Sequence, residues 1–109
     1  ELTEEQFGIA SAIAGSGPAF VAAFTEALKE VGVTKGLTDE VAAKLAEQTV
    51  AGTARHMAQA KKAPLDLANE VMTPGGSTAA GFDVLTKGGL NQLLLDTITA
   101  TMVKNAEFE

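Results

Sequence analysis

The chain has 109 residues, of which 46% are hydrophobic, and its eight basic and 14 acidic residues give a net charge of −6. The basic residues form no cluster that would predict nucleic-acid binding. The absence of cysteine and the single histidine exclude disulfides and His- or Cys-rich metal sites.

Glycine and proline divide the chain into six predicted helices, and no alternating pattern predicts a strand. The expected helices span residues 3–14, 18–31, 39–60, 64–72, 76–86 and 90–106. Thr3 and Gln6 fit a capping box, and Thr38 or Asp39 caps the third helix. We expect Gly52, in the middle of that helix, to allow the close approach of another helix. The predicted fold is a single all-α domain over residues 1–109, a bundle of about six helices.

The last predicted helix is apolar over an unusually wide arc. Three consecutive leucines, residues 93–95, cover about 200° of its circumference. One ridge consists of Leu90, Leu94, Ile98 and Met102. Because much of the hydrophobic content is alanine, the core of one copy is thin, and the second cover for this helix is most simply another subunit. The four ridge residues are therefore the predicted dimer interface. No apolar run reaches about 18 residues, so we expect no membrane span.

Residues 73–78 (Thr-Pro-Gly-Gly-Ser-Thr) are the most unusual local sequence, because they open a predicted helix. Two glycines allow a ligand to approach the backbone closely. The first amides of the helix lack internal acceptors, and the hydroxyls of Thr73, Ser77 and Thr78 add neutral donors. This arrangement suits a carboxylate or phosphate, and the alternative is an ordinary turn between two helices.

Other candidates are weaker. The segment 14–18 (Ala-Gly-Ser-Gly-Pro) lacks the third glycine of a dinucleotide fingerprint, and close helix packing is the alternative. His56 has no metal partner or adjacent nucleophile, and Lys61 and Lys62 suit the negative end of the preceding helix. The residues alone predict no catalytic group and no metal ligand.

Taken together, the segments resemble the C-terminal dimerisation domain of pyrroline-5-carboxylate reductases. The resemblance covers nearly the whole chain in order. Its segments are 14–20 (AGSGPAF), 26–28 (EAL), 32–33 (GV), 36–37 (GL), 46–50 (AEQTV), 73–78 (TPGGST) with Gly81, and 87–90 (KGGL).

The resemblance implies a cytoplasmic two-domain enzyme. A Rossmann domain upstream of this chain would bind NADPH or NADH, and the helical domain would interlock with its twin in a homodimer or a higher oligomer. Hydride transfer to C5 of the cyclic imine would give proline. The chain alone would bind no cofactor and be inactive, and no nucleic-acid or membrane partner is expected.

The resemblance also assigns residues. Thr73, Gly75, Gly76, Ser77 and Thr78 would hold the substrate carboxylate. Ser16, Gly17 and Pro18 would pack near the nicotinamide. Catalysis would depend on orientation and carboxylate anchoring rather than on a strong acid in this domain.

Three positions depart from the family pattern: Met72 before Thr73, Asn69-Glu70 where an Asp is common, and Lys61-Lys62-Ala63 where an acid and a His are common. These departures leave the segment 73–78 intact, but they leave open which cyclic imine acid is the substrate. The alternatives are a divergent paralogue acting on another cyclic imine acid, a stand-alone helical dimerisation module, and a related protein without reductase activity.

Overall fold

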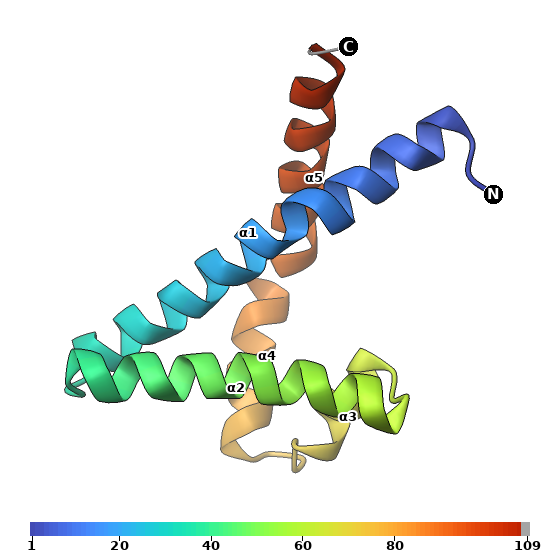
Figure 1. Ribbon diagram of the computed structural model, residues 1–109. Helices are drawn as coiled ribbons and strands as arrows, with labels where there is room; N and C mark the ends of the chain where they lie inside the picture. The colour runs from blue at the N-terminus through green and yellow to red at the C-terminus, as the bar shows by residue number, and fades with distance from the viewer. Residues whose placement is uncertain (108–109) are drawn as a thin grey trace. The chain divides into compact units, whose positions relative to one another are not determined.

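The computed structural model describes residues 1–107, and this part of the chain is helical without a strand (Figure 1). In chain order the helices are α1 (Glu4–Thr34), α2 (Asp39–Ala60), α3 (Pro64–Glu70), α4 (Ser77–Lys87) and α5 (Leu90–Glu107). The all-α prediction is confirmed.

The number of helices is five in the described residues, so the prediction of six was wrong. The first two predicted helices are one, because α1 continues through Pro18. A proline inside a helix removes one hydrogen bond and disfavours a helical conformation at the residue before it, partly through a clash with that residue's Cβ. Here that residue is Gly17, which has no Cβ. The alanine-rich sequence on both sides then favours continuation of the helix.

The predicted caps are present. Thr3 N donates to Gln6 Oε1 at 2.9 Å and Gln6 N donates to Thr3 Oγ1 at 3.1 Å, which completes the capping box. Thr38 is the N-cap of α2, and its hydroxyl accepts from Val41 N at 3.2 Å. Helix α2 has the bounds predicted for it, and α3 ends two residues earlier than expected.

The chain forms two compact units, which are described separately. The unit Val21–Pro74 contains the second part of α1, α2 and α3. Gly32 lies where α1 meets α2: a Cβ there would be 3.1 Å from Ala42 Cβ and 3.3 Å from Leu37 Cδ1. Ala42 and Ala46 are buried. At Gly52 an added Cβ would meet nothing within 4 Å, so within this chain Gly32, not Gly52, permits the close approach.

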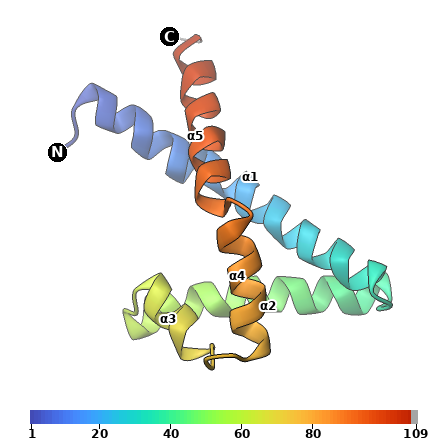
Figure 2. The same cartoon turned by 180° about the vertical axis from the view of Figure 1, so that it is seen from behind.

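The other unit comprises Glu1–Phe20 and the chain from Gly75 onward. Helices α4 and α5 contact each other here, and Gly88 and Gly89 separate them (Figure 2). A Cβ at Gly88 would lie 2.8 Å from Val84 O, and Gly89 has a φ of 92°. Both positions of this junction therefore require glycine. Ala12 of α1 is buried in this unit.

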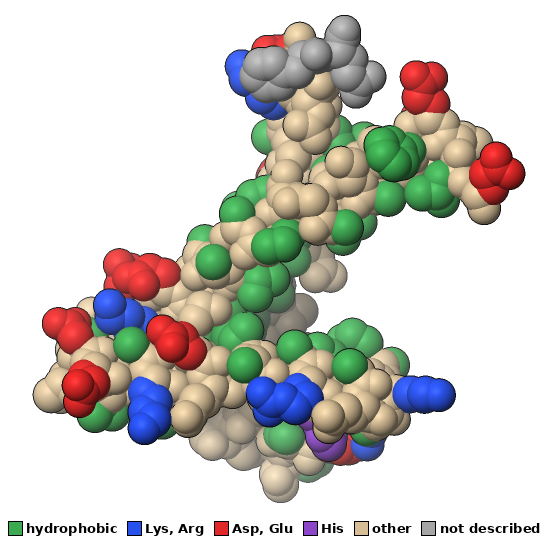
Figure 3. Space-filling model, in the orientation of Figure 1, with side chains coloured by type: hydrophobic (Ala, Val, Ile, Leu, Met, Phe, Trp, Pro, Cys, Tyr) green, Lys and Arg blue, Asp and Glu red, His purple; other side chains and the backbone are tan. Residues whose placement is uncertain are grey.

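Most large apolar side chains are exposed in the single chain. The buried hydrophobic residues among those described are the three alanines Ala12, Ala42 and Ala46, whereas Phe7, Ile13 and Val31 are each more than half exposed. Figure 3 shows apolar side chains along α1. By length and composition alone, α1 is apolar enough to cross a membrane, with a mean hydropathy of 1.6, because its glycines and hydroxyl residues scarcely interrupt the apolar sequence. The same test is passed by buried helices of proteins that do not enter membranes.

Candidate functional site: the loop that opens helix α4

The predicted anion-binding segment forms a turn followed directly by the start of α4. Gly75 has a φ of 77°, a left-handed conformation that glycine adopts without strain. Gly76 is the N-cap of α4 with extended backbone, and it has no side chain to cap the helix. The N-terminus of α4 therefore differs from those of α1 and α2, where Thr3 and Thr38 accept a hydrogen bond from a first-turn amide.

The donors of this segment have no hydrogen-bond partner among the described residues. The first backbone bond into α4 is Ala80 N to Gly76 O at 3.1 Å, so the amides of Ser77, Thr78 and Ala79 have no acceptor. The hydroxyls of Thr73, Ser77 and Thr78 take part in no side-chain hydrogen bond, and all three residues are exposed. Unpaired amides at the positive end of a helix can bind an anion without a basic side chain. The segment thus has the local geometry that the sequence predicted.

The residues expected beside the cofactor lie inside α1. Ser16 and Gly17 are half-buried and Pro18 is exposed. Amides inside a helix are bonded to carbonyls four residues back, and proline has none. The backbone of these residues therefore does not fit a cradle for a dinucleotide phosphate, and the hydroxyl of Ser16 is the one polar side-chain group among them. Their expected place near the nicotinamide remains a prediction.

The predicted interface ridge lies along α5. Leu90 is 37% exposed and Leu94 is 46% exposed, while Ile98 and Met102 are half-buried. The polar side chains of this helix bond within it. The hydroxyls of Thr97, Thr99 and Thr101 each donate to the carbonyl four residues earlier, at 2.7–2.9 Å, and Gln92 Nε2 donates to Asp96 Oδ1 at 2.9 Å. A partner can therefore cover α5 without leaving these hydroxyls unpaired.

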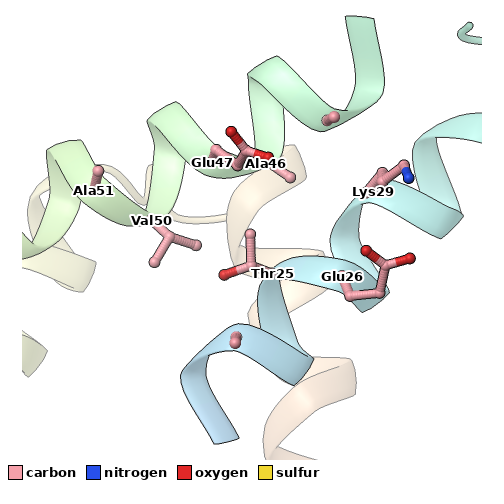
Figure 4. Close-up of a pocket in the computed structure, with 9 residues that line it drawn as sticks. Thr25, Glu26, Lys29, Ala46, Glu47, Val50 and Ala51 are labelled. Carbon is pink, nitrogen blue, oxygen red and sulfur yellow. The ribbon is translucent and has the colours of Figure 1, made fainter. Parts of the chain in front are cut away.

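Sequence reasoning missed a groove between α1 and α2, with a volume of about 400 Å³ (Figure 4). Ala46, Val50 and Ala51 of α2 face α1 here, and Val50 and Thr25 point toward each other. The Thr25 hydroxyl donates to Val21 O at 2.9 Å, so it is already bonded within α1. Glu26, Lys29 and Glu47 supply the charges. The groove contains no serine, cysteine or histidine, and its only sequence signal was the alanine-rich face of α2.

The cations at the end of α2 have different roles. Lys61 is the C-cap residue, with a left-handed φ of 53°, and its N–H donates to Met57 O. The Lys62 ammonium instead forms an ion pair with the carboxylate of Glu70, at the end of α3. This cross-helix pair was not predicted, because the sequence does not reveal how the turn between the two helices folds. His56 is exposed on α2.

The chain was compared with known proteins. The family of pyrroline-5-carboxylate reductase dimerisation domains matches residues 4–108. Pyrroline-5-carboxylate reductase 3 from Bos taurus is 37% identical, covering 98% of this chain and 35% of the relative. The pyrroline-5-carboxylate reductase of Synechocystis sp. is 37% identical, and the match covers 98% of this chain and 40% of that relative. The chain therefore spans well under half the length of the curated relatives it matches.

Solved structures agree with this comparison. A pyrroline-5-carboxylate reductase from Coxiella burnetii superposes with a TM-score of 0.92 at 36% identity, covering 98% of this chain and 40% of that one. The Plasmodium falciparum pyrroline carboxylate reductase with NADP bound gives a TM-score of 0.87 at 33% identity. That match covers 95% of this chain and 42% of the other. The family match covers residues 4–108, and the fold agrees with that of the solved reductases. The chain therefore belongs to the pyrroline-5-carboxylate reductase dimerisation family.

Proposed function

We propose that this chain is the dimer-forming and carboxylate-holding part of an NAD(P)H-dependent reductase that converts 1-pyrroline-5-carboxylate to proline. The relatives that support the proposal are named as pyrroline-5-carboxylate reductases, and one of them was solved with NADP. The observation that carries the proposal is the start of α4, where the amides of Ser77, Thr78 and Ala79 and the hydroxyls of Ser77 and Thr78 have no partner among the described residues.

In this function the substrate carboxylate accepts hydrogen bonds from the amides of Ser77, Thr78 and Ala79 and from the hydroxyls of Thr73, Ser77 and Thr78. The positive end of the α4 dipole stabilises the same charge. The nicotinamide cofactor, when bound, supplies the hydride. The chain's own contribution is to fix the carboxylate, and thereby the face and position of the imine ring, so that orientation lowers the barrier. Gly75 and Gly76 keep the approach to the amides free of side chains.

In the proposed function, a second copy of the chain covers exposed apolar side chains. Two copies form a homodimer in which the ridge Leu90, Leu94, Ile98 and Met102 is covered. The charge of −6 gives nucleic acid no attraction to the chain. The place of action is the cytoplasm. Most of the cofactor site lies in the part of the reductase that the relatives have beyond this chain, with Ser16–Pro18 packing beside the nicotinamide.

The test is steady-state oxidation of NADPH, and separately of NADH, by the full-length protein that contains this chain, with 1-pyrroline-5-carboxylate as substrate. We expect saturable turnover that forms proline. A folded, cofactor-binding protein that leaves this substrate unchanged contradicts the proposal. Turnover of another cyclic imine acid instead would identify a divergent paralogue, with the departures around Lys61 and Met72 as the first positions to examine.

A further inference from the structure

The ion pair between Lys62 and Glu70 joins the end of α2 to the end of α3. Lys62 follows the left-handed C-cap of α2, and its own N–H donates to Met57 O at 3.1 Å, so its backbone is fixed to α2. Glu70 is the last residue of α3. Both residues belong to the unit Val21–Pro74. The pair therefore spans a turn between two elements rather than one helix face.

Few polar contacts hold α3 in this unit, and of its apolar residues only Leu67 and Ala68 are half-buried. None of its seven residues is buried, and its N-cap, Ala63, has no side chain to accept a hydrogen bond. Within residues 1–107, the contact with Lys62 is the one side-chain hydrogen bond or ion pair that the structure gives to α3. The backbone then leaves α3 through two long bonds, Val71 N to Ala68 O and Met72 N to Asn69 O, both 3.3 Å. The next residue is Thr73, the first donor of the anion-binding segment.

We infer that the Lys62–Glu70 ion pair is a positioning device for this segment. It fixes α3 against the end of α2 and so limits the directions in which the chain leaves α3 toward Thr73, which is one of the proposed carboxylate donors. The inference rests on the proposed function. Lys62 and Glu70 act through Thr73 and do not themselves touch substrate, so they are positioning residues.

The test measures steady-state kinetics of the full-length protein with 1-pyrroline-5-carboxylate and NADPH. Lys62→Met and Glu70→Gln each break the pair. We expect each to raise the KM for the imine about two- to fivefold, the range expected for a partly exposed ion pair. The kcat and the KM for NADPH stay at wild-type values. Lys62→Arg and the exchange Lys62→Glu with Glu70→Lys restore the KM, because both rebuild the pair.

The Glu70→Gln variant distinguishes a positioning role of the ion pair from a purely electrostatic role. A carboxylate near an anion site repels the substrate, so a purely electrostatic role predicts that removing it lowers the KM. Positioning predicts that the KM rises. The matched control is Lys87→Met, which breaks the Lys87–Asp83 pair (3.1 Å) inside α4 without uncoupling two elements. Its KM should equal that of the wild type.

Four outcomes overturn the inference: an unchanged KM in Lys62→Met, a lower KM in Glu70→Gln, an equal rise in Lys87→Met, or no recovery in the exchanged pair. If the wild-type protein does not reduce the imine, the proposed function fails, and hydrogen exchange decides the inference. Lys62→Met should then speed exchange at the amides of Val71 and Met72 relative to Lys87→Met. Equal exchange in the two variants overturns it.

Discussion

Thr78 is the residue on which the carboxylate role depends most directly. Its amide and its hydroxyl both lack a partner among the described residues, and it lies in the first turn of α4. In the proposed reductase, Thr78→Ala removes one hydrogen bond to the substrate carboxylate, and a hydrogen bond to a charged group is worth about 1.5–3 kcal/mol. We therefore expect the KM for the imine to rise at least about tenfold.

The control for this prediction is Thr86→Ala on the same helix. The Thr86 hydroxyl donates to Phe82 O at 3.0 Å and is thus engaged within α4. Its removal should leave the KM unchanged. Equal kinetics of Thr78→Ala and the wild type would remove Thr78 from the site.

At the scale of elements, helix starts in this chain use two designs. Helices α1 and α2 begin at threonines that accept a hydrogen bond from a first-turn amide, whereas α4 begins at a glycine. The first design stabilises the helix by itself. The second leaves donors available to a ligand at a cost in helix stability. Helix α3 also begins without a side-chain cap, at Ala63, so the candidate site is distinguished by its hydroxyls and by the turn at Gly75 as well as by the uncapped start of α4.

Removal of the Thr38 cap tests the first design. Thr38→Ala should lower the free energy of unfolding by about 1 kcal/mol, because Val41 N loses its acceptor. Chemical denaturation of the chain, at a concentration where its association state is constant, measures the effect. Thr53→Ala, an exposed position inside α2, should be neutral or slightly stabilising, since alanine is the better helix former. A Thr38→Ala variant as stable as Thr53→Ala would show that this cap contributes nothing.

Local signals in the sequence predicted what is local in the structure. The capping residues, the bounds of α2 and the glycine turn before α4 all depend on neighbours within a few residues. Pro18 was misread as a helix boundary because its usual effect was considered without the missing Cβ of Gly17. The close contact at Gly32 and the Lys62–Glu70 pair could not be predicted, because each depends on how a turn folds back on itself.

At the scale of the whole molecule, the surface indicates that one copy is incomplete. The buried hydrophobic residues among those described are three alanines, whereas Phe7, Val84 and Leu93 are each more than half exposed. Membership of a dimerisation family means that the chain associates with itself. The thin core was predictable from the number of alanines. Which apolar side chains the second copy covers was not, because α1 and α5 both leave large ones exposed.

Leu94→Asp tests the assignment of the α5 ridge. Leu94 is 46% exposed in the single chain, and a carboxylate there would be buried without a partner if the ridge is the interface. We expect the variant to sediment as a monomer or to fold poorly. Asn91→Asp adds the same charge at an exposed polar position of α5 and should sediment as the wild type does. Wild-type association of Leu94→Asp would place the interface elsewhere.

The proposed role of this chain is to hold the carboxylate of a cyclic imine while the ring is reduced. The most direct measurement compares two substrates of the full-length protein: 1-pyrroline-5-carboxylate and 1-pyrroline, which is the same ring without the carboxylate. The account predicts a kcat/KM at least about tenfold higher for the carboxylated imine, because only that substrate uses the charged hydrogen bonds at the start of α4. Equal kcat/KM for the two imines would contradict it.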